Sequence, residues 1–153
     1  MTHFKYSPKY ARAQRGFSLL EIMVVLVILG LLVGIVAPNV LQNVGKAEQQ
    51  KVKTDFKAIE TALKTYRLDN YSYPTTEQGL EALVSRSNLS PEPRNFQKGG
   101  YLPTVPKDPW GRPYVYFSPG EHGEFDIYTL GADGVQGGDD NNKDVGNWEE
   151  DDR

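Results

Sequence analysis

The chain has 153 residues, a formal net charge of −3 at pH 7 and no cysteine. This composition excludes a disulfide framework, a thiolate nucleophile and a cysteine-based zinc site. An acidic chain does not attract nucleic acid electrostatically, so we expect no nucleic-acid partner. After the apolar amino-terminal region, roughly 115 residues remain, which is enough for one small domain with a modest core.

An apolar stretch runs from Phe17 to Ala37, with a single acidic residue, Glu21, near its start. As a helix this stretch would be about 32 Å long, which matches the hydrocarbon thickness of a bilayer, so we predict a transmembrane helix over residues 17–38. The first basic residue after the stretch is Lys46, whereas four precede it: Lys5, Lys9, Arg12 and Arg15. This asymmetry predicts that the leader stays cytoplasmic and that the following domain faces outward.

Glu21 is a candidate functional residue, because an acid in apolar surroundings needs a cation to neutralise it. Cleavage after Gly16 would remove residues 1–16 and expose the α-amino group of Phe17, which could pair with Glu21 of a neighbouring copy. Two simpler interpretations compete with this hypothesis. A secretory signal peptide would have to be cut after Ile35-Val36-Ala37, which is a poor cleavage site, and a plain single-span anchor would leave Glu21 unpaired.

Pro38 follows the apolar stretch. Because proline lacks a backbone N–H donor and its ring clashes with the preceding turn, we predict that the helix is kinked or melted near residues 34–39. Beyond it, apolar residues recur every three or four positions, which is typical of a helix with one buried face. We expect this face to pack on the domain that follows. Its members are Val52, Phe56, Ile59, Leu63 and Tyr66.

The later part of the chain shows short elements joined by turns. Thr75 and Gln78 form a capping-box pattern, which predicts a short helix that ends near Val84. Residues 85–100 are rich in proline and glycine and are expected to form a loop. Two apolar runs separated by turn residues predict a small antiparallel hairpin, 114–117 paired with 125–130.

The connector before this hairpin has the sequence Pro109-Trp110-Gly111-Arg112-Pro113. We expect Trp110 to cover the edge of the core and Arg112 to pair with a nearby acid or carbonyl group. No catalytic constellation is recognisable elsewhere, because His122 lies in a turn without an obvious nucleophile and no phosphate-binding glycine loop is present. An enzymatic function is therefore not expected.

Aspartates, asparagines and glycines alternate between Asp133 and Asp144. Hard oxygen ligands on a glycine-rich loop are what Ca²⁺ requires, and without a cation these carboxylates would repel one another. An acidic, solvated segment without metal is the alternative. An EF-hand is not expected, because the loop that would start at Asp140 has Val145 where that motif requires glycine.

Several motifs together resemble a known family. Residues 15–21, Arg-Gly-Phe-Ser-Leu-Leu-Glu, followed by apolar residues, resemble the processing motif of type IV pilins and of type II secretion pseudopilins. The segments 73–83, 108–114 and 130–148 resemble the major pseudopilins of type II secretion systems. The resemblance covers almost all of the chain after Gly16.

The resemblance implies an α+β, pilin-like fold. In this fold a long N-terminal helix, with a membrane half and an amphipathic half, packs on a small antiparallel β-sheet domain with a calcium-binding C-terminal loop. The implied organisation is a cleaved leader (1–16), a transmembrane and assembly helix (17–38) and a periplasmic globular domain (39–153). For the loop it implies one Ca²⁺, held by carbonyls of Leu130 and Val135 and by carboxylates chosen from Asp133, Asp139, Asp140 and Asp144.

The implied function is that of a structural subunit. Prepilin peptidase would cleave after Gly16 and methylate Phe17, and the subunits would leave the inner-membrane lipid to form a helical periplasmic filament that drives export of folded proteins across the outer membrane. Minor pseudopilins and an inner-membrane assembly platform are further implied partners. Three alternatives stay open: a type IV pilin, a minor pseudopilin, and a membrane-anchored calcium-binding periplasmic module of another class.

Overall fold

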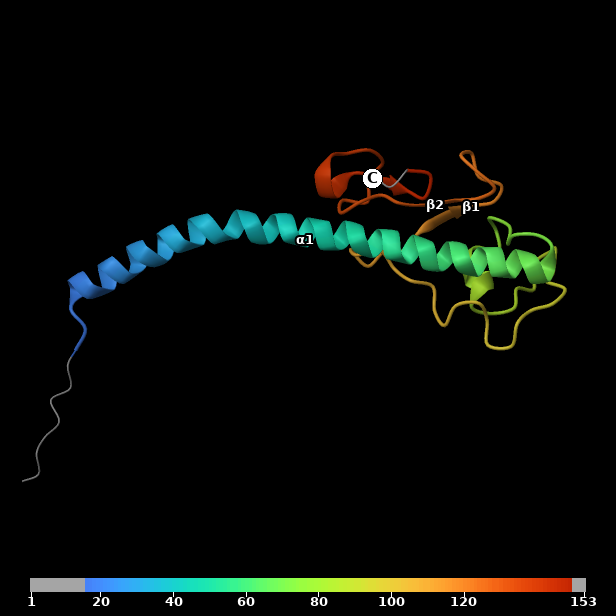
Figure 1. Cartoon of the computed structure of the whole chain (residues 1–153), viewed down its shortest axis with the longest axis horizontal. Helices are drawn as coiled ribbons and strands as arrows, with labels where there is room; N and C mark the ends of the chain where they lie inside the picture. Colours follow the sequence, from blue (N-terminus) through green and yellow to red (C-terminus); the bar gives the residue numbers. More distant parts are fainter. Residues whose placement is uncertain (1–15, 150–153) are drawn as a thin grey trace, which may run out of the picture. The chain divides into compact units, whose positions relative to one another are not determined.

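The computed structural model describes residues 16–149, except for the side chains of residues 37–42. The predicted leader, apart from Gly16, lies outside this range. The chain divides into two compact units with a boundary between Leu41 and Gln42, so the predicted domain boundary after residue 38 stays a prediction. One long helix, α1 (Leu19–Asn70), contributes residues to both units (Figure 1).

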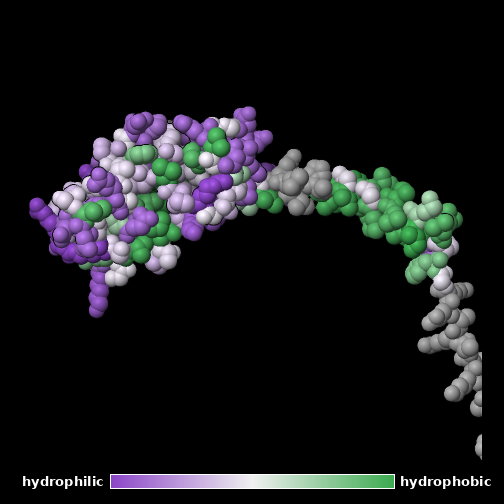
Figure 2. All heavy atoms as spheres, turned by 180° about the vertical axis from the view of Figure 1, so that it is seen from behind, coloured by the Kyte–Doolittle hydropathy of each residue, from purple (hydrophilic) through white to green (hydrophobic). Residues whose placement is uncertain are grey.

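The first unit consists mainly of the apolar half of α1. Its segment Leu19–Val36 is long and apolar enough to cross a membrane. Figure 2 shows the side chains of this half as an almost continuous apolar surface. The helix continues through Pro38, so the predicted melted stretch is wrong, whereas the alternative of a kink stays a prediction. Proline removes only one backbone donor, and the neighbouring hydrogen bonds can carry a helix past it.

The second unit is built on the other half of α1. The predicted apolar stripe is buried: Val52, Ile59 and Leu63 are 0% exposed, Tyr66 is 2% and Phe56 is 6% exposed. Each such side chain contributes about 1.5 to 3 kcal/mol when it leaves water, so this stripe holds the domain on the helix. The stripe packs in one core with side chains from later elements: Leu80, Leu83, Tyr114, Tyr116, Phe125 and Ile127.

A three-stranded antiparallel sheet covers this core. Its strands follow one another in chain order: β1 (Val115–Phe117), β2 (Asp126–Thr129) and β3 (Val145–Gly146). Tyr116 lies opposite Ile127, and Tyr128 lies opposite Gly146. The predicted hairpin is confirmed, whereas the third strand was not predicted, because two residues are too few to show an alternating pattern.

The predicted capping box is confirmed. The Thr75 backbone N–H donates to Gln78 Oε1 at 3.0 Å, and the Gln78 N–H donates to Thr75 Oγ1 at 3.2 Å. The expected helix is only one 3₁₀ turn, η1 (Leu80–Leu83), because Gly79 has a φ of 63° and interrupts regular helix. Gln78 Nε2 also donates to the carbonyl of Leu89 at 2.8 Å and thereby fixes the long loop that follows.

Candidate functional site

The predicted cleavage site lies directly before α1. Gly16 and Phe17 are in irregular backbone, and Phe17 is 77% exposed. A Cβ built on Gly16 would meet nothing within 4 Å, so the peptide bond between these residues is not crowded by the described part of the chain. An enzyme could reach this bond without unfolding the helix.

Glu21 has a local structural role in addition to its expected functional role. Its backbone N–H donates to Ser18 Oγ at 3.1 Å, so Ser18 is the N-cap of α1 and Glu21 is in the first turn. A carboxylate at this place also interacts favourably with the helix dipole. The prediction from sequence missed this cap, although Ser-x-x-Glu at residues 18–21 was a recognisable signal.

Helix capping does not neutralise the charge of Glu21. Its side chain is exposed in the single copy, and among residues 16–149 no cationic side chain pairs with it. The flanking side chains are apolar, with Leu20 and Met23 exposed at 72% and 57%. In an apolar environment the cation would have to come from a chain terminus or from another molecule.

The C-terminal loop has the second group of predicted site residues. The Gly134 N–H donates to the Leu130 carbonyl at 3.2 Å, and the Val135 N–H donates to Asp133 Oδ1 at 3.0 Å. Asp144 Oδ2 accepts from the Gly137 N–H at 2.9 Å, whereas Asp144 Oδ1 is buried without a hydrogen-bond partner. A buried carboxylate oxygen without a partner is what a missing cation would leave behind.

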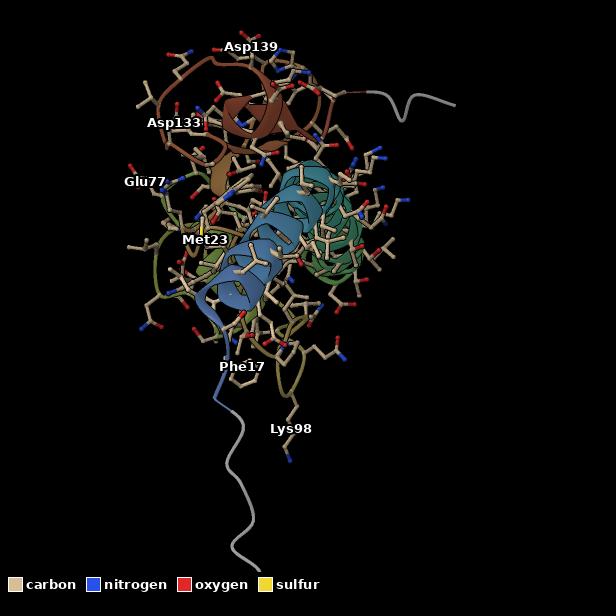
Figure 3. All side chains as sticks on the ribbon, turned by 90° about the vertical axis from the view of Figure 1, so that its left-hand side faces the viewer. Phe17, Met23, Glu77, Lys98, Asp133 and Asp139 are labelled. Carbon is tan, nitrogen blue, oxygen red and sulfur yellow. The ribbon has the colours of Figure 1, made fainter. Side chains whose placement is uncertain are left out.

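The predicted calcium ligands are near one another in sequence but do not form a closed cluster. Among the described residues, no three acidic or histidine side chains converge as a metal site. Asp139 and Asp140 are exposed at the start of η2 (Asp140–Asn142), and Figure 3 shows Asp133 on a different part of the loop from Asp139. The donor chemistry and the Asp144 oxygen fit Ca²⁺, whereas the choice among the aspartates stays a prediction.

Arg112 fixes the backbone of this loop. Its Nη1 donates to the Gly131 carbonyl at 2.5 Å and its Nη2 to the Ala132 carbonyl at 2.6 Å, which confirms the expected pairing with carbonyl groups. Gly134 has a φ of 71°, and a Cβ there would lie 2.8 Å from Arg112 Cζ. The guanidinium therefore lies directly against the loop, and a side chain at residue 134 would displace it.

The turn that presents Arg112 is held by a buried acid. Asp108 is 4% exposed, and its Oδ1 accepts from the backbone N–H groups of Trp110 at 3.1 Å and Arg112 at 2.7 Å. Its Oδ2 accepts from Thr129 Oγ1 at 2.8 Å. Trp110 is half-buried and is not among the core side chains, so the expectation that it covers the core edge is wrong. Backbone hydrogen bonds to Asp108, rather than the indole ring, hold this turn.

His122 belongs to a contact that the sequence did not reveal. Its ring stacks on Trp148 with centroids 3.9 Å apart, and its Nδ1 lies 3.0 Å from Asp126 Oδ2. Burial opposes the charge on Asp126, but hydrogen bonds from the His122 ring and the Glu121 and His122 backbones outweigh it and lower the Asp126 pKa. This contact holds the C-terminal segment against the hairpin turn, and it has no adjacent nucleophile that would suggest catalysis.

We predict that Arg112→Met lowers the free energy of unfolding by about 2 kcal/mol or more, because two carbonyl groups lose a charged donor. The measurement is urea unfolding of the full-length chain in detergent, followed by fluorescence of Trp110 and Trp148. Arg94→Met is the matched control: Arg94 is exposed and has no ion pair among the described residues, so its replacement should change stability by less than about 0.5 kcal/mol. Equal stability of the two variants would contradict the role given to Arg112.

Comparisons with known proteins agree over both units. The family model "Type II secretion system (T2SS), protein G" matches residues 39–148, and the model "Prokaryotic N-terminal methylation motif" matches residues 11–37. Type II secretion system core protein G of Vibrio cholerae serotype O1 is 57% identical over 140 residues, which cover 92% of this chain and 95% of that protein. The core protein G of Pseudomonas aeruginosa is 54% identical over 138 residues, covering 90% and 97%.

A solved structure shows the same fold. The crystal structure of the major pseudopilin from the type 2 secretion system of enterohaemorrhagic Escherichia coli matches with a TM-score of 0.64 and 50% identity. The match covers 72% of this chain and 95% of that chain. The predicted α+β, pilin-like fold class is thereby confirmed. The chain belongs to the type II secretion system protein G family.

Proposed function

We propose that the chain is the major pseudopilin of a type II secretion system, a structural subunit without enzymatic activity. The observation that carries this conclusion is that the methylation-motif match (residues 11–37) and the family match (residues 39–148) together leave out only residue 38 between residues 11 and 148. A leader, an apolar helix and a folded domain therefore occur in the order that a pseudopilin requires. The subunits would polymerise into a filament that drives export of folded proteins across the outer membrane.

The first step is processing at the exposed bond after Gly16. Prepilin peptidase removes the basic leader and methylates the new amino group of Phe17, which stays cationic. Four of the 17 basic residues leave with the leader, whereas all 20 acidic residues stay, so the mature chain has a net charge of −7. Before cleavage no α-amino group exists near Glu21, so processing is the step that makes assembly possible.

Assembly then depends on electrostatic pairing in the filament interior. Glu21 of one copy pairs with the Phe17 amino group of a neighbouring copy as both enter apolar surroundings. An unpaired charge there would cost several kcal/mol, so the pair favours correctly placed subunits over misplaced ones. The remaining partners are minor pseudopilins and the inner-membrane assembly platform. The segment Leu19–Val36 anchors each subunit in the inner membrane before assembly, with the folded domain in the periplasm.

We predict that Glu21→Gln leaves cleavage and methylation intact but lowers filament formation at least tenfold. Glutamine keeps the size of the side chain and can replace glutamate in a capping box, so this variant removes the charge and spares the cap. Mass spectrometry of the amino terminus measures processing, and electron microscopy of sheared filaments measures assembly. Wild-type numbers of filaments from this variant would contradict the charge pair.

Ser18→Ala is the control for the capping role. It removes the N-cap and costs about 1 kcal/mol of helix stability, but it retains the charge of Glu21. We expect filament formation close to wild type. An assembly defect as severe as that of Glu21→Gln would mean that capping, rather than charge, explains Glu21.

We also propose that the loop binds one Ca²⁺. The support is chemical: Asp133 and Asp144 supply carboxylates, Asp144 Oδ1 lacks a partner, and the Leu130 and Val135 carbonyls are close in sequence. Asp139 or Asp140 would complete the set after a local movement of the loop. The ion would neutralise like charges and keep this part of the surface in one conformation, as Arg112 does through the carbonyl groups of Gly131 and Ala132.

We predict that Ca²⁺ at a hundredfold excess over its Kd stabilises the wild-type chain by about 2.7 kcal/mol, which raises Tm by roughly 10 °C. Asp133→Asn should lose most of this increase. Glu77→Gln is the control, because Glu77 is an exposed acid outside the loop (Figure 3), and it should keep the full increase. Tryptophan fluorescence during heating, with Ca²⁺ or with a chelator, gives the comparison, and identical wild-type Tm values would exclude the metal.

A further inference from the structure

Two apolar side chains are exposed where α1 ends. Leu68 is 78% and Tyr71 is 77% exposed, far more than the apolar side chains of the core. Together with Lys64, Arg67 and Tyr73 they line a hollow of about 550 Å³. Lys64 and Arg67 are already paired with Glu60 and Glu124, so it is the exposed apolar side chains at this hollow that are typical of a binding surface.

Tyr71 has a strained backbone. Its φ is 65°, a left-handed conformation that glycine adopts readily and other residues rarely do. Its N–H donates to the Arg67 carbonyl at 2.7 Å and closes the helix, which a glycine would do with less strain. Among residues 16–149 the Tyr71 ring has no stacking partner and its hydroxyl has no hydrogen bond. No contact of the Tyr71 side chain among the described residues therefore offsets the strain of its backbone.

Two further cations lie in a loop that is attached to this helix end. Asn95 ties their loop to α1, because its N–H donates to Asn70 Oδ1 at 2.9 Å and its Nδ2 donates to the Asp69 carbonyl at 3.1 Å. The neighbouring Arg94 and Lys98 are exposed and have no ion pair among the described residues, and Figure 3 shows Lys98 projecting away from the domain. We define the distal surface as Leu68, Tyr71, Arg94 and Lys98.

A surface of complementary character lies at the other end of the same unit. The acidic loop, residues 133–144, has four aspartates and one lysine, so it stays negative even with one Ca²⁺ bound. Val135 in this loop is 63% exposed and adds an apolar contact between the acids. The loop lies against the beginning of the second unit, because a Cβ on Gly45 would be 2.6 Å from Asn141 Oδ1.

The two surfaces cannot meet within one molecule. Gly45 and Tyr71 are separated by 26 helical positions, which correspond to about 39 Å along α1. Figure 1 shows the C-terminal loop beside the middle of α1, away from the end of the helix at Asn70. A partner that fits the cationic, apolar distal surface must therefore be a different molecule, and a second copy of this chain has the matching loop.

We propose that the distal surface of one copy binds the acidic loop of another copy in the assembled filament. The inference rests on the proposed function, because it assigns a contact within that filament. Such a contact joins two different surfaces, so repeating it produces an open filament rather than a closed dimer. Arg94 and Lys98 attract the acidic loop, and Leu68 and Tyr71 pack against Val135.

The absence of cysteine makes a direct test possible in the full-length chain. Leu68→Cys and Val135→Cys are combined in one chain, both at exposed positions that the fold does not need. Filaments assembled in cells that contain the complete secretion system are treated with a short bis-maleimide and analysed by denaturing electrophoresis. We expect a ladder of dimers, trimers and higher multimers, because each copy contributes one cysteine to each of two contacts.

Each single-cysteine variant is a control and should stay monomeric. A third variant combines Val135→Cys with Phe117→Cys, which is exposed at 44% but lies on β1 outside the distal surface, and should also give no ladder. Filaments without a ladder from the first pair would overturn the inference and leave the proposed function standing. Dimers from a single-cysteine variant would also overturn it. If the cysteine-free chain formed no filaments, the proposed function and the inference would both fail.

Discussion

The negative charge of Glu21 limits the surroundings in which the apolar half of α1 can be placed. An acid in an apolar helix is acceptable only where a cation neutralises it, and the described part of the chain supplies none. In the proposed mechanism, proteolysis after Gly16 creates an amino group at the right place in sequence, so assembly would become possible only in processed subunits. The same helix, α1, has at its other end the apolar stripe that holds the folded domain, so one element joins the assembly signal to the domain.

In the folded domain, the polar side chains described above fix the surface loops and do not form a catalytic pocket. Asp108 holds the turn that presents Arg112, and Arg112 holds the carbonyl groups of Gly131 and Ala132. His122 and Trp148 fasten the following segment to the hairpin turn. These two attachments keep the acidic loop between them on the outside of the domain, where it is exposed to solvent.

The sequence was informative wherever a feature repeats locally. Periodicity and short-range hydrogen bonds determine three features that could be predicted. They are the apolar stripe from Val52 to Tyr66, the capping box of Thr75 and Gln78, and the hairpin. Three features depend on contacts between residues that are distant in sequence, so no local pattern predicts them. They are the short strand β3, the stacking of His122 on Trp148 and the buried hydrogen bonds of Asp108. The proposed calcium ligands are an intermediate case: the composition of the loop favours the ion, but which aspartates would converge depends on the conformation that the loop would adopt around it.

The most direct test is a structure of the assembled filament at a resolution that shows side chains. If the two charges pair, the methylated amino nitrogen of Phe17 lies within about 4 Å of the Glu21 carboxylate of a neighbouring subunit, in surroundings without water. The contrary result is that the two groups lie far apart and are each solvated or paired with another side chain. That result would contradict the pairing of Glu21 with Phe17 even if the filament formed normally.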